Sequence, residues 1–177
     1  MKIGNSTTNM KASGWWIVAL GALFVGWIFW QTSKVTSSIK HSPFEVVLND
    51  LDGQAFAMNS LLGKVAIIDF WATWCGPCRQ EIPGFIDLHN RYSSQGVEIV
   101  GIAMESGTAE QIKQFAQKFG MNYRILMGTA EAVEAFGGLD AYPTTLVFDR
   151  EGNLVERHVG YRPREVFEQE ILGLLQK

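Results

Sequence analysis

Cysteine is scarce in this sequence, and its scarcity narrows the range of functions. Two cysteines occur among 177 residues, too few for a small scaffold held together by disulfides or for a zinc site with four thiolate ligands. Hydrophobic residues make up 47% of the chain and charged residues 19%, which excludes a disordered chain. The sequence also lacks a phosphate-binding loop, a metal-site spacing and a serine–histidine nucleophile pattern. Whatever the two cysteines do, they do as a pair.

Acidic residues are absent from the first 40 residues, which carry four lysines and a net charge of +4. The remaining residues, 41–177, carry the other 11 basic side chains and all 18 acidic ones, a net charge of −7. A domain of that charge repels phosphate backbones, so we expect no nucleic-acid partner. The length allows one ordinary domain with an appendage.

An apolar run of 16 residues, 15–30, lies in the basic N-terminal segment. Extended to residues 14–32, it would form a helix of roughly 28 Å at about 1.5 Å per residue, close to the bilayer core of about 30 Å. Tryptophans flank the run at both ends, as at membrane interfaces: Trp15, Trp16, Trp27 and Trp30. The pattern predicts a transmembrane anchor at 14–32 that contacts the lipid bilayer.

A cleaved signal peptide is the competing interpretation of this segment, but the apolar core of a signal peptide is usually shorter and ends in small residues. Here the run ends in Ile28-Phe29-Trp30. Flanking positive charges weakly favour a cytoplasmic N-terminal tail at 1–13. Residues 33–42 are polar and serine-rich, and we expect a linker there, followed by a folded domain at 43–177.

Apolar runs and amphipathic segments in the remainder of the chain predict an α/β sandwich. Continuous apolar runs indicate buried strands at 65–71 and 97–103, with a helix between them. The apolar side of that helix carries Ile82, Phe85, Ile86 and His89. A capping box at Thr108 starts the next helix, and Gly120 ends it. The remaining predicted elements are a strand at 123–126, a helix at 131–136, a hairpin of strands at 144–149 and 154–159, and a last helix opened by Pro163.

The cysteines, Cys75 and Cys78, stand where a predicted strand ends and a helix begins. Unpaired N–H groups and the dipole at a helix N-terminus stabilise a thiolate, so we expect a lowered pKa and a nucleophilic Cys75. Cys78 lies one turn later, close enough to attack a mixed disulfide and release the product. Pro77 is tolerated in a first helical turn. Two buried apolar side chains, or half of a metal site, are the alternatives, and the CxxC pattern at this junction argues against both.

The dipeptide between the cysteines bears on the direction of electron flow. A histidine there would stabilise the thiolate and make the protein an oxidant, whereas Gly76 and Pro77 have no charged or hydrogen-bonding side chain. We therefore expect a reductase that needs no cofactor beyond the redox-active disulfide Cys75–Cys78. A disulfide-forming oxidase is the alternative.

Two residues outside the CxxC motif are further candidates for the site. Asp69 lies on an otherwise apolar strand, where burial would raise the pKa of its carboxyl and let it exchange a proton with Cys78; alternatively, it reaches water at the strand end. Pro143 precedes a predicted strand, where an ordinary trans proline is allowed. A cis bond would instead place its loop beside the cysteines and leave the backbone of Tyr142 free to pair with a substrate peptide. The sequence favours the proton-exchange role for Asp69 and does not choose between the cis and trans forms of Pro143.

The segment Trp71–Cys78, with Asp69 before it and Tyr142–Thr145 after it, resembles the thioredoxin superfamily. Over residues 44–175 the chain is similar to the membrane-anchored TlpA/ResA-like thiol–disulfide oxidoreductases. The narrower resemblance depends on the predicted anchor and on three segments, Asn49–Gly53, Cys78–Pro83 and Tyr123–Phe136. It implies a thioredoxin fold, a mixed central sheet flanked by helices, with an N-terminal hairpin and a strand–helix insert, preceded by one transmembrane helix.

The resemblance also implies a location and a reaction. The domain would face the periplasmic or outer side of the bacterial cytoplasmic membrane, accept electrons from a membrane electron-donor protein and reduce disulfides in client proteins. Apocytochromes c and copper-site assembly proteins are common clients of such proteins. Cys75 would be the attacking thiol and Cys78 the resolving thiol. The residues expected to contact substrate are Trp74, Gly76, Pro77, Tyr142 and a cis Pro143.

Departures from the family pattern leave the identity of the client protein undetermined. Asp69 and the Gly76-Pro77 dipeptide match thioredoxin itself, and Thr144 stands where the cytochrome-maturation subgroup often has glutamate.

Two other functions compete with that of a disulfide reductase. A Cu(I)-binding assembly chaperone would hold metal with both thiols, but no histidine or methionine is near them in sequence. A peroxidase of the same superfamily would not need a second cysteine three residues after the first.

Overall fold

The computed structural model describes residues 42–176, so the expected tail, the transmembrane anchor at 14–32 and the linker up to residue 41 lie outside the described residues. In residues 42–176 no helix is long and apolar enough to cross a membrane. A five-stranded mixed sheet organises this part of the chain, in the order β5-β4-β3-β6-β7. Its strands are β3 (Val65–Trp71), β4 (Val97–Ala103), β5 (Arg124–Met127), β6 (Thr144–Phe148) and β7 (Leu154–Val159).

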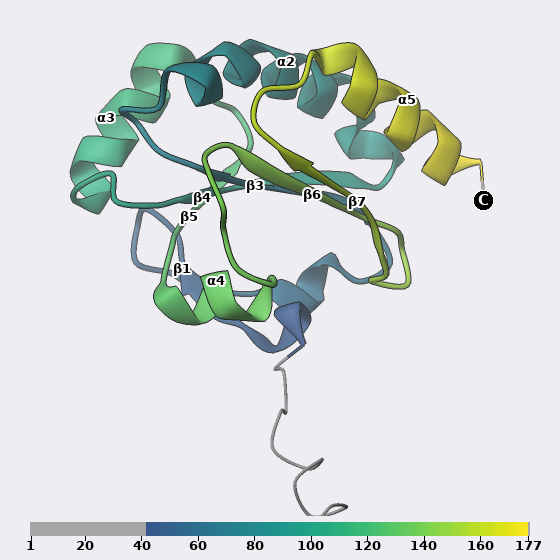
Figure 1. Cartoon of the computed structure of the whole chain (residues 1–177), viewed down its shortest axis with the longest axis horizontal. Coiled ribbons are helices and arrows are strands. Elements are labelled where there is room, and N and C mark those ends of the chain that lie inside the picture. Colours follow the sequence, from purple (N-terminus) through teal and green to yellow (C-terminus); the bar gives the residue numbers. More distant parts are fainter. Residues whose placement is uncertain (1–41, 177) are drawn as a thin grey trace, which may run out of the picture. The chain divides into compact units, whose positions relative to one another are not determined.

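Helices cover both faces of the sheet (Figure 1). One face carries α2 (Gly76–Tyr92), α3 (Ala109–Phe119) and α5 (Arg164–Leu175). The opposite face carries α4 (Ala130–Ala135), the hairpin of β1 (Val47–Asn49) and β2 (Ala55–Ala57), and the short 3-10 helices η1 (Pro43–Glu45) and η2 (Met58–Leu61). A third 3-10 helix, η3 (Ser93–Gln95), follows α2. This is the α/β architecture that the sequence predicted, with a hairpin before the sheet and a strand and helix, β5 and α4, before β6.

Strand β3 lies in the middle of the sheet and explains the continuous apolar run seen in the sequence. It pairs in parallel with β4 and antiparallel with β6, and all seven of its residues are buried. Such a strand has no solvent face, because helices cover it on both sides. Alternate residues therefore enter different cores: Ile67 packs under α2 and α5, whereas Ile68 packs with the hairpin and α4.

The apolar face of α2 differs from the predicted one. Leu88 and Tyr92 are buried, whereas Ile86 and His89 are only partly buried. The side of α2 that faces the sheet includes Cys78 and Phe85. Leu88 lies on the same side and is buried in the core. Tyr92 lies beside α5, where its hydroxyl donates to Glu168 at 2.7 Å.

The expected helix boundaries are correct at α3 and differ slightly at α5. Thr108 and Gln111 form the capping box, and Gly120 ends α3 with a left-handed φ of 68°. Pro163 does not occupy the first turn of α5. It is the extended N-cap residue, so the helix begins at Arg164.

Candidate active site

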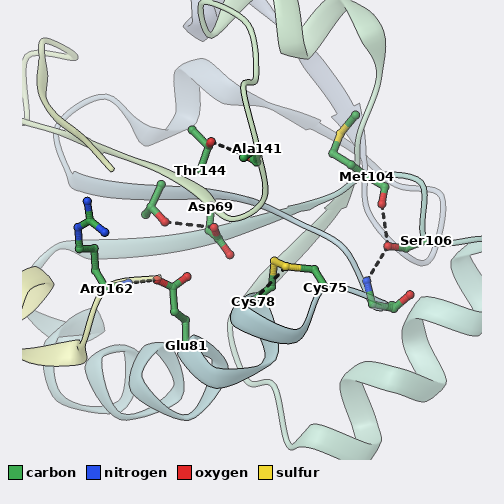
Figure 2. Close-up of a disulfide and its surroundings, with 11 residues drawn as sticks. Asp69, Cys75, Cys78, Glu81, Met104, Ser106, Ala141, Thr144 and Arg162 are labelled. Carbon is green, nitrogen blue, oxygen red and sulfur yellow. Dashed lines mark hydrogen bonds between the residues drawn. A yellow bond between two sulfur atoms is a disulfide. The ribbon is translucent and has the colours of Figure 1, made fainter. Parts of the chain in front are cut away.

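The two cysteines form a disulfide at the N-terminus of α2 (Figure 2). Cys75 is the N-cap residue, and its Sγ accepts a hydrogen bond of 3.2 Å from the backbone N–H of Cys78. Cys75 is 5% exposed and Cys78 is 1% exposed, so Cys75 is the one with more access to solvent. Because the free N–H groups and the dipole of α2 are directed at Cys75, its thiolate is stabilised when the disulfide is reduced. Gly76 and Pro77 form the first turn between the two sulfurs.

An aromatic pair lies beside the disulfide. Trp74 is 58% exposed, and its ring packs edge-on against Tyr142 with 5.7 Å between ring centroids. Tyr142 also packs against the buried cluster that contains Cys75 and Cys78. The structure thus brings the loop before Pro143 next to the CxxC motif.

The peptide bond between Tyr142 and Pro143 is cis, which resolves the alternative that the sequence left open. Two hydrogen bonds fix the backbone around this bond. The Thr144 hydroxyl donates to the carbonyl of Ala141 at 2.8 Å, and the backbone N–H of Gly160 donates to the carbonyl of Pro143 at 2.8 Å. These contacts hold the proline loop in place at the start of β6.

Asp69 is buried on β3 and does not reach water, since its exposed fraction is 3%. Its Oδ1 accepts a hydrogen bond of 3.2 Å from the hydroxyl of Thr145, its partner on β6. Burial raises the pKa of Asp69 well above its ordinary value, and the charge of Glu81 raises it further, while the bond from Thr145 opposes the shift. The carboxyl can therefore hold a proton in the pH range in which most aspartates are ionised.

Glu81 is a second buried acid, which the sequence indicates only as part of the Cys78–Pro83 segment of the family resemblance. It is 3% exposed, and its Oε1 accepts a hydrogen bond of 2.6 Å from the backbone N–H of Arg162. Burial raises the pKa of Glu81 from 4.5 to about 7, opposed by the bond and the charge of Arg162. The signal that could have revealed it is its spacing: three residues after Cys78, Glu81 lies on the same side of α2.

The carboxyl groups of Asp69 and Glu81 both lie on the Cys78 side of the disulfide (Figure 2). Tyr123 is also buried, and burial together with the charges of Asp69 and Glu81 raises the pKa of its hydroxyl above its ordinary value. Neighbouring buried carboxyls resist being ionised together. Because both pKa values are raised, the pair can hold a proton beside the redox centre near neutral pH.

Within residues 42–176 no group of three or more histidine, cysteine, aspartate or glutamate side chains is arranged to hold a metal ion. The chemistry that the observed geometry supports is thiol–disulfide exchange with a nearby proton carrier.

Comparison with known proteins points to the same chemistry. The AhpC/TSA family model matches residues 40–157. The chain is 31% identical over 153 residues to the thiol-disulfide oxidoreductase ResA of Halalkalibacterium halodurans, covering 86% of this chain and 85% of that one. ResA of Bacillus anthracis is 30% identical over 122 residues, covering 69% of this chain and 70% of that one.

A solved structure shows the same fold. The crystal structure of a thiol:disulfide interchange protein of the thioredoxin family from Chlorobium tepidum superposes with a TM-score of 0.68 and 34% identity, covering 73% of this chain and 92% of that one. The thioredoxin fold predicted from the sequence is therefore confirmed. The chain belongs to the thioredoxin-like AhpC/TSA family and is a thiol–disulfide oxidoreductase of the ResA type.

Proposed function

We propose that this protein is a membrane-anchored, extracytoplasmic reductase of disulfides in client proteins. The observation that carries the proposal is the Cys75–Cys78 pair at the N-terminus of α2, with two buried carboxyl groups on its Cys78 side. A thiolate-stabilising position at the helix N-terminus, a more deeply buried resolving position and a proton carrier are the parts that dithiol exchange requires.

The reaction begins with the reduced dithiol. The Cys75 thiolate attacks one sulfur of a client disulfide, which forms a Cys75–client disulfide and releases the other client sulfur as a thiolate. Cys78 then loses its proton and attacks the Cys75 sulfur. The products are the Cys75–Cys78 disulfide and a second client thiolate, so two electrons pass to the client. A dithiol on a membrane electron-donor protein returns them.

Asp69 and Glu81 serve the second step. The Cys78 thiol is buried, and burial raises the pKa of a thiol, so it needs a nearby base to become a nucleophile. An ionised carboxylate of the pair accepts that proton, and the protonated form returns one when the disulfide is reduced again. Because Glu81 has a pKa of about 7, both forms are present near neutral pH.

The surroundings of Cys75 support the direction of electron flow. The Gly76-Pro77 dipeptide supplies no side-chain donor to its sulfur, and the hydrogen bond that the sulfur accepts comes from the backbone of Cys78. The reduced state therefore lacks the additional stabilisation that makes some relatives strong oxidants. Equilibration with glutathione measures this property. A reduction potential near the thioredoxin value of about −270 mV supports a reductase, and one near about −120 mV identifies a disulfide-forming oxidase.

Location and client are part of the same proposal. Residues 14–32 have the length and the flanking tryptophans of a bilayer anchor, and the family resemblance supports an extracytoplasmic domain with clients such as apocytochromes c or copper-site assembly proteins. In intact cells, after reduction, a membrane-impermeant thiol reagent should label Cys75. Labelling that requires cell lysis would contradict the proposed location.

A Cu(I)-binding chaperone makes a different prediction for the same two thiols. It would bind Cu(I) tightly in a one-to-one complex, and Cys75→Ser would abolish that binding. Turnover of a disulfide substrate without such binding supports the reductase instead.

A further inference from the structure

The segment that follows β4, Met104–Ser106, has an unusual backbone. Glu105 has a φ of 46° and is the one non-glycine residue with a positive φ within residues 42–176. A left-handed conformation is unfavourable for a side chain with a Cβ atom and persists only where its surroundings enforce it. Such residues are concentrated at functional sites, which directs attention to what Glu105 contacts.

Two hydrogen bonds join this segment to the residues just before Cys75. The indole Nε1–H of Trp74 donates to the carbonyl of Glu105 at 3.0 Å. The backbone N–H of Thr73 donates to Oγ of Ser106 at 2.9 Å, and the Ser106 hydroxyl donates in turn to the carbonyl of Met104 at 2.8 Å. Figure 2 shows the Ser106 hydroxyl between these two partners.

We propose that Glu105 and Ser106 are positioning residues that hold Trp74 in the orientation against which a client segment docks. The inference rests on the proposed function of the site, and it adds residues that touch neither sulfur. The left-handed backbone of Glu105 turns its carbonyl toward the indole. Ser106 fixes the peptide N–H one residue before Trp74.

The exposure of Trp74 argues that this arrangement serves binding. The ring is 58% exposed, so the buried core does not require it to be fixed. An exposed tryptophan that is free to change rotamer would lose that freedom when a client binds, and the lost conformational entropy would weaken binding. Fixing the ring beforehand, edge-on to Tyr142, removes this cost. Weakening the hydrogen bonds should therefore raise KM for a protein substrate and leave the chemical step unchanged.

Matched variants of the full-length protein separate this role from a general structural one. Ser106→Ala removes the bond to Thr73, and Ser106→Thr keeps a hydroxyl. Glu105→Val disfavours the left-handed backbone, because Val is β-branched. Glu105→Gly favours it and keeps the carbonyl.

Steady-state reduction of insulin and of 5,5′-dithiobis(2-nitrobenzoate) tests the proposal. For Ser106→Ala and Glu105→Val we expect KM for insulin to rise about three- to tenfold, the effect of one lost hydrogen bond, with kcat and the rate with the small disulfide within about twofold of wild type. Ser106→Thr and Glu105→Gly should behave like wild type. In a Trp74→Phe background, which has no indole N–H, Glu105→Val should have no further effect.

Other outcomes overturn the proposal. An unchanged KM for insulin, equal losses with both substrates, or an undiminished effect of Glu105→Val in the Trp74→Phe background would each contradict positioning through Trp74. The wild-type reaction tests the proposed function separately. If wild type oxidises reduced proteins instead of reducing insulin, the reductase proposal fails. The same KM comparison, made with a reduced protein substrate, then decides the positioning role.

Discussion

The backbone N–H of Arg162 donates a hydrogen bond of 2.6 Å to Oε1 of Glu81, and this contact joins the segment after β7 to the first turns of α2. It fixes a carboxyl group one turn beyond Cys78. The second oxygen of that carboxyl, Oε2, is buried and makes no hydrogen bond within residues 42–176. Glu81 is thus held by one oxygen, while the other stays available on the side where Asp69 and the disulfide lie (Figure 2).

Glu81→Gln should change how stability depends on pH. The folded protein binds a proton at Glu81 more tightly than the unfolded chain, since the pKa rises from 4.5 to about 7. This stabilisation is complete below about pH 4.5 and is lost as the pH rises through 7, a change of about 3 kcal/mol in the free energy of unfolding. Glutamine keeps an oxygen acceptor for Arg162 and removes the titration. Denaturant unfolding from pH 4 to pH 8 should therefore show a smaller decline than in wild type.

The matched control for this substitution is Glu134→Gln, an exposed glutamate on α4. It should leave the pH dependence of unfolding as in wild type. If Glu81→Gln and Glu134→Gln give the same curve as wild type, Glu81 does not titrate near 7.

Asp69→Asn should slow dithiol exchange. The substitution keeps an oxygen that accepts the hydrogen bond from Thr145, and it removes the carboxylate that could accept a proton from Cys78. General acid–base groups contribute about 10²–10⁴ to a rate, and Glu81 remains present, so we expect a loss of about tenfold or more near pH 7. The single-turnover rate of resolution of a mixed disulfide on Cys75, measured from pH 5 to pH 9, checks this. A pH profile identical to that of wild type would return Asp69 to a structural role.

Thr145→Val tests the role of Asp69 by changing the pKa of its carboxyl instead of removing the carboxyl. The hydrogen bond from Thr145 lowers the pKa of Asp69, so its removal should raise that pKa further. The Asp69 limb of the pH–rate profile should then move to higher pH, with the fold retained because valine has a similar shape. A shift to lower pH would show that the bond does not act on the ionised form.

Arg157 on β7 holds the segment that leads to Tyr142. Its guanidinium donates to the carbonyls of Phe136 at 3.2 Å and Gly138 at 2.7 Å. The ammonium of Arg157→Lys cannot reproduce this fork, so we expect a loss of about 1–2 kcal/mol in the free energy of unfolding. Amide hydrogen exchange should become faster at residues 136–140. Arg150→Lys, at an exposed hairpin turn, is the control, and equal exchange in both variants would contradict the role of Arg157.

The elements around the site could be predicted from the sequence because their signals are local. The apolar run of β3, the CxxC motif and the capping box at Thr108 each lie within a few consecutive residues, and the structure contains the corresponding strand, helix start and cap. The burial of Asp69 could be expected for the same reason, since a central strand has no exposed face.

Other features depend on contacts between distant segments and could not be predicted in that way. Glu81 accepts a hydrogen bond from the backbone of Arg162, which lies 81 residues later in the sequence and packs against it only in the folded chain. The apolar face of α2 includes Tyr92 because α5 supplies Glu168 as a partner for its hydroxyl. The carbonyl of Pro143 is fixed by the backbone N–H of Gly160, which reaches it only in the folded sheet.

A trapping experiment tests whether Cys75 attacks client disulfides and Cys78 resolves the product. Full-length Cys78→Ala, expressed in its own host, should accumulate mixed disulfides that a reducing agent releases, because the resolving thiol is missing. The linked proteins should be extracytoplasmic: one or two would identify a dedicated assembly reductase, and many a general one. Cys75→Ser should accumulate none. Adducts of equal abundance on Cys75→Ser, or none on Cys78→Ala, would contradict these roles of the two cysteines.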